Sequence, residues 1–414
     1  MRIPRTMGSA SGPEMDLLCA CISPTRSAAV SDWPFWDGPI DWPRFMELAT
    51  NHHVLPLVWR ALKSAQGKAP VPADWLARLR VFQTAIAAHN LRATALLLRL
   101  QQLMESHGIR LVPIKGPVLA RLAYGDVALR QFEDLDLIVR RPDLLCAVDL
   151  LERDGFGLRE LSNAVDRPRY LATLQNWSME KPGSPPLDLK PVLVSHALCG
   201  EPSADFMASA CRRIPIDEKR SLWAPGPEAM LLAVCLDGAN EMWFKLSSVA
   251  DAGALLAKYA DLDWSVFLAE AARFGQRRSL LVGACLAEEL LGIDLPSAFR
   301  EGDRQDPAAR RLALAAADRL RSLAPRHSIV FRQSCFALRT RERMRDRFRF
   351  LSRLLFVPGA FDLAAMPLPN VLYSLHSLAR PVRLAWNVAV RRGRSRRLTV
   401  RPAGERLTDN AKGS

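Results

Sequence analysis

Hydrophobic residues recur at helical spacing in two long parts of the chain, before and after a shorter stretch with a different pattern. In the first part this spacing predicts two short helices within residues 41–63 and a long helix over 75–107, which Gly108 ends as a C′ glycine. In the second part, apolar stripes with a period near 3.6 predict helices over 227–238, 244–258, 264–274, 279–291, 307–323, 339–356, 368–378 and 381–391.

Between these two parts, short apolar runs bounded by turn residues predict strands. Helices are expected after Pro117 and over 143–154, and the strand-like runs cover 109–114, 135–139, 156–160, 176–180 and 187–193. We therefore expect an α+β fold, in which a small mixed sheet is embedded between N-terminal and C-terminal helical regions. The expected divisions are a loose leader at 1–30, an N-terminal helical region at 31–108, an α/β core at 109–215, a C-terminal helical domain at 216–392 and a basic, disordered tail at 393–414.

Composition narrows the class of protein. The 414 residues are 49% hydrophobic and carry 57 Lys and Arg against 43 Asp and Glu, a formal charge of +14. These proportions suit a globular protein and exclude general disorder, and no apolar run reaches the roughly 18 residues that a membrane helix needs. The eight cysteines are mostly single residues within apolar segments. That usage is typical of buried thiols in a reducing compartment, so we expect a cytoplasmic protein.

The positive charge is concentrated toward the C-terminus. Residues 337–401 contain fifteen arginines, no lysine and only three acidic residues. Guanidinium groups favour planar recognition of phosphate or carboxylate. The segment is therefore either a solvated helix face with a basic tail or a surface for an anionic partner: a membrane, an acidic acceptor or a nucleic acid.

Two aspartates stand two positions apart at the start of a predicted strand. Asp134 and Asp136 alternate with the apolar residues of the run 135–139, and side chains at i and i+2 of a strand point to the same face. Neighbouring carboxylates repel one another unless a cation lies between them, and Mg²⁺ prefers such hard oxygen ligands. A solvated edge strand would show the same pattern, so the pair is weak evidence when taken alone.

A glycine junction upstream strengthens this interpretation. Lys115, Gly116 and Pro117 separate a predicted strand from a predicted helix. Gly116 allows a ligand to approach the backbone, Pro117 suits the first turn of a helix, and such a junction presents free N–H groups to a phosphate. Lys115 would add a full charge there or point to solvent, and Arg130 would meet a phosphate or pair with a carboxylate.

Asp188 is the candidate third carboxylate. It lies in PPLDLKPVLV, on a predicted strand after a Pro/Gly turn, with Leu187 and Leu189 on the opposite face. Phosphoryl and nucleotidyl transfer use two cations about 3.5–4 Å apart. Asp134 and Asp136 would hold these cations, and Asp188 would complete the ion nearer the attacking hydroxyl. A carboxylate at the end of a turn is the alternative reading of Asp188.

The glycine, the alternating Asp134 and Asp136 and the later Asp188 together resemble the nucleotidyltransferase superfold. The segments IKGPVLARLAYGD, EDLDLIV and LDLKPVLV are similar to a widespread bacterial nucleotidyltransferase family of largely uncharacterised activity. HHVLPLVWRAL near the start and RDRFRFLSRLLFVPGAFDLAAMPLPNVLYSLHSLARPVRL near the end resemble the flanking helices of that family, so the resemblance covers most of residues 40–385.

The resemblance implies a minimal nucleotidyltransferase core that uses Mg²⁺ or Mn²⁺ and an NTP donor, and it implies a role in polysaccharide or peptide natural-product biosynthesis. Two positions depart from the family pattern. Gly116 is followed by Pro117, where the superfold usually has serine or glycine, and Lys190 stands where the family often has histidine after the third carboxylate. These departures bear on how the donor is positioned and which acceptor is used.

The leading hypothesis is a Mg²⁺-dependent nucleotidyltransferase that moves an NMP from an NTP to an acceptor hydroxyl or phosphate. Asp134, Asp136 and Asp188 would hold the metal, and Lys115, Gly116 and Arg130 would bind the donor. The first alternative is a non-catalytic helical adaptor with a relic core and a basic region that binds a partner or a membrane. The second is a transferase that modifies nucleic acid, which we favour less because the positive charge lies away from the carboxylates. No P-loop, dinucleotide-binding or nucleophile-elbow motif is present.

Overall fold

The computed structural model describes residues 12–32, 39–159, 176–191, 204–322, 329–357, 375 and 377–384. The chain divides into two compact units, Met1–Phe350 and Leu351–Ser414. The first unit contains the sheet and every residue that the sequence singled out for the site.

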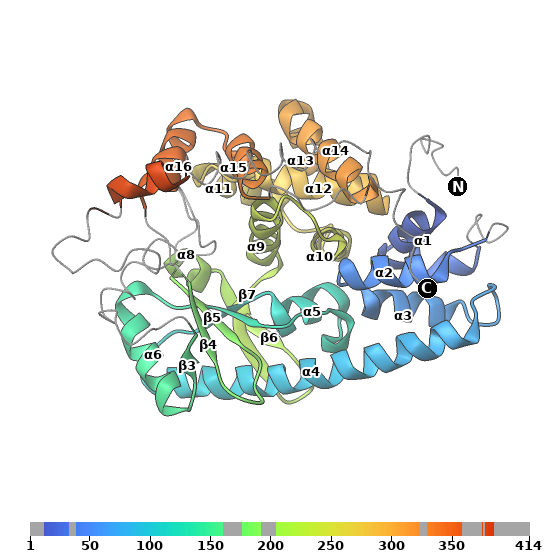
Figure 1. Cartoon of the computed structure of the whole chain (residues 1–414), viewed down its shortest axis with the longest axis horizontal. Coiled ribbons are helices and arrows are strands. Elements are labelled where there is room, and N and C mark those ends of the chain that lie inside the picture. The colour runs from blue at the N-terminus through green and yellow to red at the C-terminus, as the bar shows by residue number, and fades with distance from the viewer. Residues whose placement is uncertain are drawn as a thin grey trace, which may run out of the picture. The chain divides into compact units, whose positions relative to one another are not determined.

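The N-terminal part of the first unit is helical. α2 (Trp42–Asn51) and α3 (Leu55–Ser64) confirm the two short helices, and α4 (Ala73–Glu105) confirms the long one. Its 33 residues make α4 about 50 Å long at 1.5 Å per residue, and it runs from the N-terminal helices to the sheet (Figure 1). Gly108, beyond its end, has the positive φ of +71° that the sequence predicted.

Five strands form the sheet at the centre of the site. Its order is β1-β2-β5-β4-β3, and β2 pairs with β5 in parallel while the other pairs are antiparallel. All five predicted runs contain a strand, and the α+β fold with a mixed sheet is confirmed. The bounds are β1 (Val112–Ile114), β2 (Leu135–Ile138), β3 (Gly157–Leu158), β4 (Trp177–Glu180) and β5 (Leu187–Lys190), with α5 (Gly116–Tyr124) after β1 and α6 (Leu144–Arg153) after β2.

Alternation along the central strands separates an apolar face from a polar one. Asp136, Ser178, Asp188 and Lys190 share one face, since strand neighbours two apart point the same way. The apolar face is at most 2% exposed and consists of Leu135, Leu137, Trp177, Met179, Leu187 and Leu189. Burial of this face fixes the strand register, and with it the side on which the polar residues gather.

A β-hairpin that the sequence did not predict follows the sheet. β6 (Cys211–Pro215) and β7 (Ser221–Pro225) come after α8 (Ala204–Ser209), and β7 packs beside β1. The exposed Arg212 and Arg213 interrupt the apolar pattern of β6, which explains why the pattern gave no strand there. The hairpin extends across residue 215, where we expected the core to end.

Helices make up the rest of the described chain. The predicted helices between 227 and 323 are confirmed, and the one at 339–356 is confirmed from residue 344 onward as α16; α13 and α15 are additional helices. Most of the expected helices at 368–378 and 381–391, and the whole tail at 393–414, lie outside the described residues, although 377–384 are helical. The bounds are α9 (Pro227–Asn240), α10 (Leu246–Lys258), α11 (Trp264–Arg273), α12 (Arg277–Leu291), α13 (Ser297–Gln305), α14 (Pro307–Ser322), α15 (Ile329–Thr340) and α16 (Met344–Phe356).

The expected loose leader at 1–30 is wrong for residues 13–22, which form α1 (Pro13–Ile22). Leu17, Leu18 and Cys21 are fully buried, and α1 packs against α3 and α12. The hydroxyl of Ser23 donates to the carbonyl of Leu291 at 2.8 Å and holds the end of α1 in place. The short apolar run is therefore a core helix, because it is apolar on all sides and surrounded by other helices.

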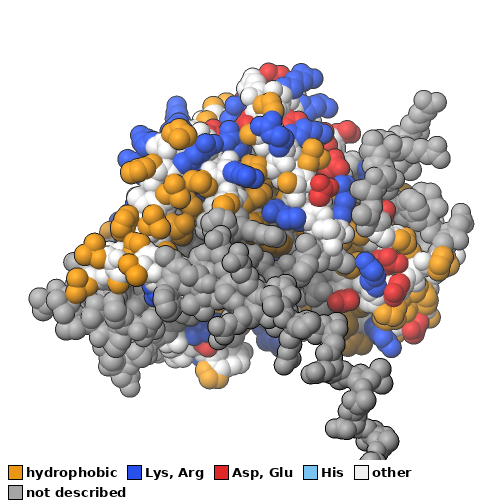
Figure 2. Space-filling view, turned by 45° about the horizontal axis from the view of Figure 1, so that its top comes forward, with side chains coloured by type: hydrophobic (Ala, Val, Ile, Leu, Met, Phe, Trp, Pro, Cys, Tyr) orange, Lys and Arg blue, Asp and Glu red, His pale blue; other side chains and the backbone are white. Residues whose placement is uncertain are grey.

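The burial of the cysteines, the lengths of the helices and the surface charges can also be compared with the expectations from the sequence. Cys19, Cys21, Cys235 and Cys285 are buried and free, as expected, whereas Cys146 is exposed and Cys211 and Cys335 are partly exposed. Burial raises the pKa of Cys19 to about 12. None of the helices in the described ranges has the length and apolar character that crossing a membrane requires. On the face in Figure 2, lysines and arginines are interspersed with hydrophobic and acidic side chains.

Candidate active site

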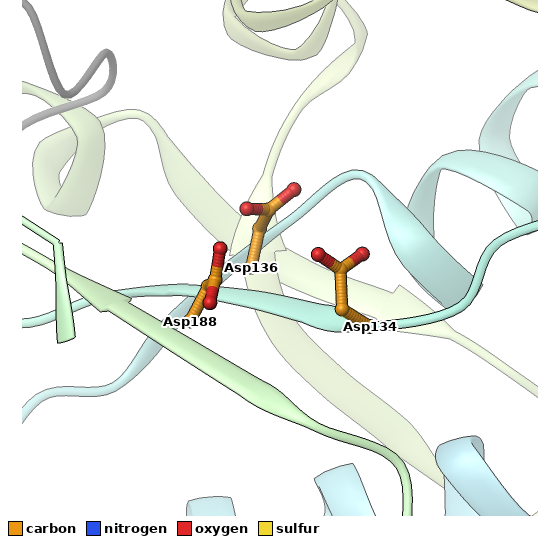
Figure 3. Close-up of side chains that lie close together, drawn as sticks. All are labelled: Asp134, Asp136 and Asp188. Carbon is orange, nitrogen blue, oxygen red and sulfur yellow. The ribbon is translucent and has the colours of Figure 1, made fainter. Parts of the chain in front are cut away.

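Three aspartates on two neighbouring strands lie close together. Asp134 directly precedes β2, Asp136 lies within β2, and Asp188 lies within β5 as the register partner of Asp136. One carboxylate oxygen from each residue lies within 4.8 Å of those of the other two. All three side chains leave the same side of the sheet (Figure 3). The structure thus brings together the three carboxylates that the sequence singled out.

The two carboxylates of the DLD sequence have opposite electrostatic properties. Burial, together with the negative charges of Asp136 and Asp188, raises the pKa of Asp134 to about 6. Burial also acts to raise the pKa of Asp136, but the ammonium groups of Lys115 and Lys190 outweigh it and lower that pKa to about 2. Among the described residues, Asp134 therefore carries the negative charge of the three that has no close cationic partner, and it is also the most exposed of the three side chains.

Two lysines reach the carboxylates, and the sequence did not predict that either would. The Nζ of Lys190 donates a hydrogen bond to Asp136 and lies 3.8 Å from Oδ2 of Asp188. The Nζ of Lys115 lies 3.6 Å from Oδ2 of Asp136, but it is closer, at 2.7 Å, to Oδ2 of Asp237 on α9. Lys115 therefore faces into the site rather than toward solvent, and Asp237 is its main partner.

Two donors, one within β4 and one directly before it, orient Asp188. The hydroxyl of Ser178 donates to Oδ1 of Asp188 at 2.6 Å, and the amide of Asn176 donates to Oδ2 at 3.1 Å. Ser178 is the direct cross-strand partner of Asp188 in the antiparallel β4–β5 pair. The tight turn between two predicted strands was the signal for this pairing, yet only the register shows which residue of β4 faces Asp188.

The glycine junction has the predicted form. β1 ends at Ile114, and α5 begins at Gly116, which has a φ of +44°. Lys115 before it has a φ of +56° and a ψ of −134°, a sparsely populated conformation that costs a non-glycine residue about 1–3 kcal/mol. Pro117 has no N–H, so Gly116 and Val118 supply the backbone donors of this first turn, at the positive end of the helix.

Arg130 pairs with a buried carboxylate. Its Nε lies 2.9 Å from Oδ2 of Asp251, which is 2% exposed and also accepts a hydrogen bond from the hydroxyl of Tyr124 at 2.7 Å. Of the two roles that the sequence left open for Arg130, the structure shows the carboxylate pair. A role toward the donor phosphates stays a prediction. Because Arg130 is close enough to lower the pKa of Asp136, the network contributes to the charge of the site.

The carboxylate cluster fits a hard divalent cation. Oxygens on one octahedral Mg²⁺ lie about 2.1 Å from the ion, so two of them are about 3–4.2 Å apart. The spread of up to 4.8 Å in the cluster needs only small side-chain rotations to reach that geometry. Carboxylates without nitrogen or sulfur ligands match both Mg²⁺ and Mn²⁺.

Comparison with known proteins agrees with this geometry. A family model described as an uncharacterised nucleotidyltransferase matches residues 38–292, which is more than half of the chain and contains all the predicted site residues. A comparison with curated proteins finds no match. The matched range includes α2, α3 and α4 before the sheet, the sheet itself and the helices through α12. The chain therefore belongs to this family of uncharacterised nucleotidyltransferases.

Proposed function

We propose that this protein is a metal-dependent nucleotidyltransferase that moves an NMP from an NTP to a hydroxyl or phosphate of an acceptor. The proposal rests on one observation above all, the convergence of Asp134, Asp136 and Asp188 on the polar face of β2 and β5. Bound Mg²⁺ would neutralise the triphosphate and polarise its α-phosphorus. The acceptor would be a small molecule, a glycan or a peptide.

Different residues of the site bind the metal ion, bind the donor phosphates and act on the acceptor. Asp134, Asp136 and Asp188 hold the cation, while Lys115, Arg130 and the backbone N–H groups at Gly116 and Val118 bind the donor phosphates. The acceptor oxygen forms a bond to the α-phosphorus, the bond from that phosphorus to the bridging oxygen breaks, and pyrophosphate leaves with those electrons. Ser178 on β4 and Asn176 directly before it keep Asp188 oriented toward the acceptor, where its charge favours loss of the acceptor's proton to water.

Binding and transfer test this function separately. Thermal unfolding with Mg²⁺ and each of the four NTPs should show a nucleotide-dependent rise in Tm, and labelled NTP should yield a labelled acceptor across an acceptor panel. Asp136→Asn should abolish both effects while the protein still unfolds cooperatively. Asp261→Asn, at an exposed position between α10 and α11, should change neither. No shift and no product with any NTP would refute the proposal.

One observation favours the alternative of a non-catalytic adaptor. Lys115 and Lys190 already pair with Asp136, so the cluster carries less free negative charge than three aspartates alone. In that case the Arg-rich segment 337–401 would bind an anionic partner or membrane, and the core would not respond to Mg²⁺ and NTP. Binding to RNA or DNA that weakens steeply with salt would instead point to a nucleic-acid substrate.

A further inference from the structure

The ammonium group of Lys190 lies close to two of the three carboxylates of the site. Lys190 lies on β5 two positions after Asp188, so its side chain shares the polar face of the sheet. Its ammonium donates to Oδ1 of Asp136 and lies 3.8 Å from Oδ2 of Asp188, with 13% of the side chain exposed. One positive charge therefore bridges the two carboxylates that the strand register pairs.

We propose that the Lys190 ammonium takes the place of one of two divalent cations, so that the site binds a single metal ion between Asp134 and Asp136. This inference rests on the proposed function, because it concerns the metal that nucleotidyl transfer would use. The position between Asp136 and Asp188 is then filled by the Lys190 ammonium instead of a metal ion.

The volume available between Asp136 and Asp188 supports this assignment. A second divalent ion that bridged Asp136 and Asp188 would lie about 2.1 Å from an oxygen of each. The ammonium already in hydrogen-bond contact with Asp136 occupies that volume. Lys115 does not compete for it, because Lys115 is 2.7 Å from Asp237 and 3.6 Å from Asp136.

The net charge of the site also supports a single metal ion. Three carboxylates carry three negative charges, which one divalent ion and one ammonium balance. Two divalent ions beside the same ammonium would leave two excess positive charges in a partly buried site before any nucleotide arrives. In the view of Figure 3, Asp136 lies between Asp134 and Asp188, and Asp134 is the most exposed of the three carboxylates, so an ion from solvent can reach it most readily.

Counting bound Mn²⁺ on the full chain tests the inference. Mn²⁺ alone serves as the probe, and its EPR signal separates free from bound ion. We expect one bound ion per chain in the wild type, one in Lys190→Arg and two in Lys190→Gln. Lys219→Gln, at an exposed position in the β6–β7 turn, should keep one ion and serves as the matched control for loss of a lysine.

The possible results separate this inference from the proposed function. Two ions in the wild type would overturn the inference alone, since Lys190 would then yield its place to metal. A single ion in Lys190→Gln that still unfolds like the wild type would also overturn it. No Mn²⁺ bound by any of the proteins would overturn the metal-dependent function and this inference with it. The wild-type count needs no variant, so a folding defect in Lys190→Gln leaves the test intact.

Discussion

Asn90 and Arg130 are joined by a hydrogen bond across 40 positions of sequence, with Nδ2 of Asn90 2.7 Å from the carbonyl oxygen of Arg130. The same amide donates to the carbonyl of Val127, also at 2.7 Å, and Asn90 is fully buried. Asp134 follows Arg130 by four residues. The long helix α4 thereby fixes the segment that leads directly into the carboxylate cluster.

Asn90→Ala should destabilise the protein. The change leaves two partly buried carbonyls without their donor. An unmet buried group costs about 1–3 kcal/mol, and because water can reach these two carbonyls in part, the free energy of unfolding should fall by about 2–4 kcal/mol. Urea denaturation measures this change. Gln83→Ala is the control on the same helix, because Gln83 makes one bond, at 3.0 Å to Ala128. Equal losses in the two variants would contradict this role of Asn90.

Metal binding should depend on pH through Asp134. The pKa of this carboxyl is raised to about 6, and Mg²⁺ requires the ionised form. The apparent Mg²⁺ affinity should therefore be constant above about pH 7 and fall up to tenfold per unit below about pH 6. The Mg²⁺-induced rise in Tm between pH 5 and 8 measures it, and Asp134→Asn should remove this dependence.

Without metal, the same carboxyl should affect stability in the opposite sense. Its pKa is higher in the folded protein than the usual 3.8, so the folded state binds the proton more tightly than the unfolded state does. The stability that this proton contributes is lost as the pH rises from about 4 through 6. Asp134→Asn should therefore be more stable than the metal-free wild type at pH 7. The reverse order would contradict the raised pKa.

Ser178→Ala should lower kcat. Hydrogen bonds to charged groups contribute about 1.5–3 kcal/mol, which corresponds to a loss of about tenfold to a hundredfold in rate if Asp188 loses its orientation. Steady-state kinetics with the identified NTP measure this effect. Ser184→Ala, in the turn between β4 and β5, is the control and should be neutral.

Gly116 and Gly108 form a matched pair. Both have positive φ, +44° and +71°, and at neither would an added Cβ come closer than 3.5 Å to a neighbour. Each change to alanine should therefore cost about 1 kcal/mol through backbone strain alone. Only Gly116→Ala, at the start of α5, should raise the KM for NTP. An unchanged KM would argue against phosphate binding at this junction.

The ion pair between Arg130 and Asp251 should contribute to the stability of the protein. Asp251→Ala leaves Arg130 as a buried cation without its partner, which should reduce stability by about 3–5 kcal/mol. Tyr124→Phe removes one hydrogen bond from Asp251 and should cost about 1 kcal/mol. Equal costs, measured by urea denaturation, would mean that Asp251 does not stabilise Arg130.

Local patterns were sufficient to predict the five strands of the sheet, most of the helices and the three carboxylates. The spacing of Asp134 and Asp136 fixes their common face whatever the rest of the chain does, and Gly116 followed by Pro117 identifies the start of a helix. The same reasoning missed α1, because a short apolar run has the same composition in a loose segment and in a core helix. Only its contacts with α3 and α12 distinguish the two.

The contacts that organise the site depend on pairings between distant segments. Lys190 reaches Asp136 only because β5 lies beside β2, and Ser178 reaches Asp188 only because of the β4–β5 register. Asn90 sits in the middle of a helix, where nothing in its neighbourhood indicates what its amide will meet. No local periodicity carries such information.

The strict alternation of the central strands acts as a check on assembly. If β5 slipped by one residue against β2, Leu187 and Leu189 would turn to the polar face, and Asp188 and Lys190 would enter the apolar interior. Buried without partners, those charges would unfold the core rather than leave a folded protein with a defective site. Selection for a stable sheet and selection for a competent carboxylate cluster therefore act on the same residues. Any molecule that reaches the stable fold also has its three carboxylates and Lys190 in position.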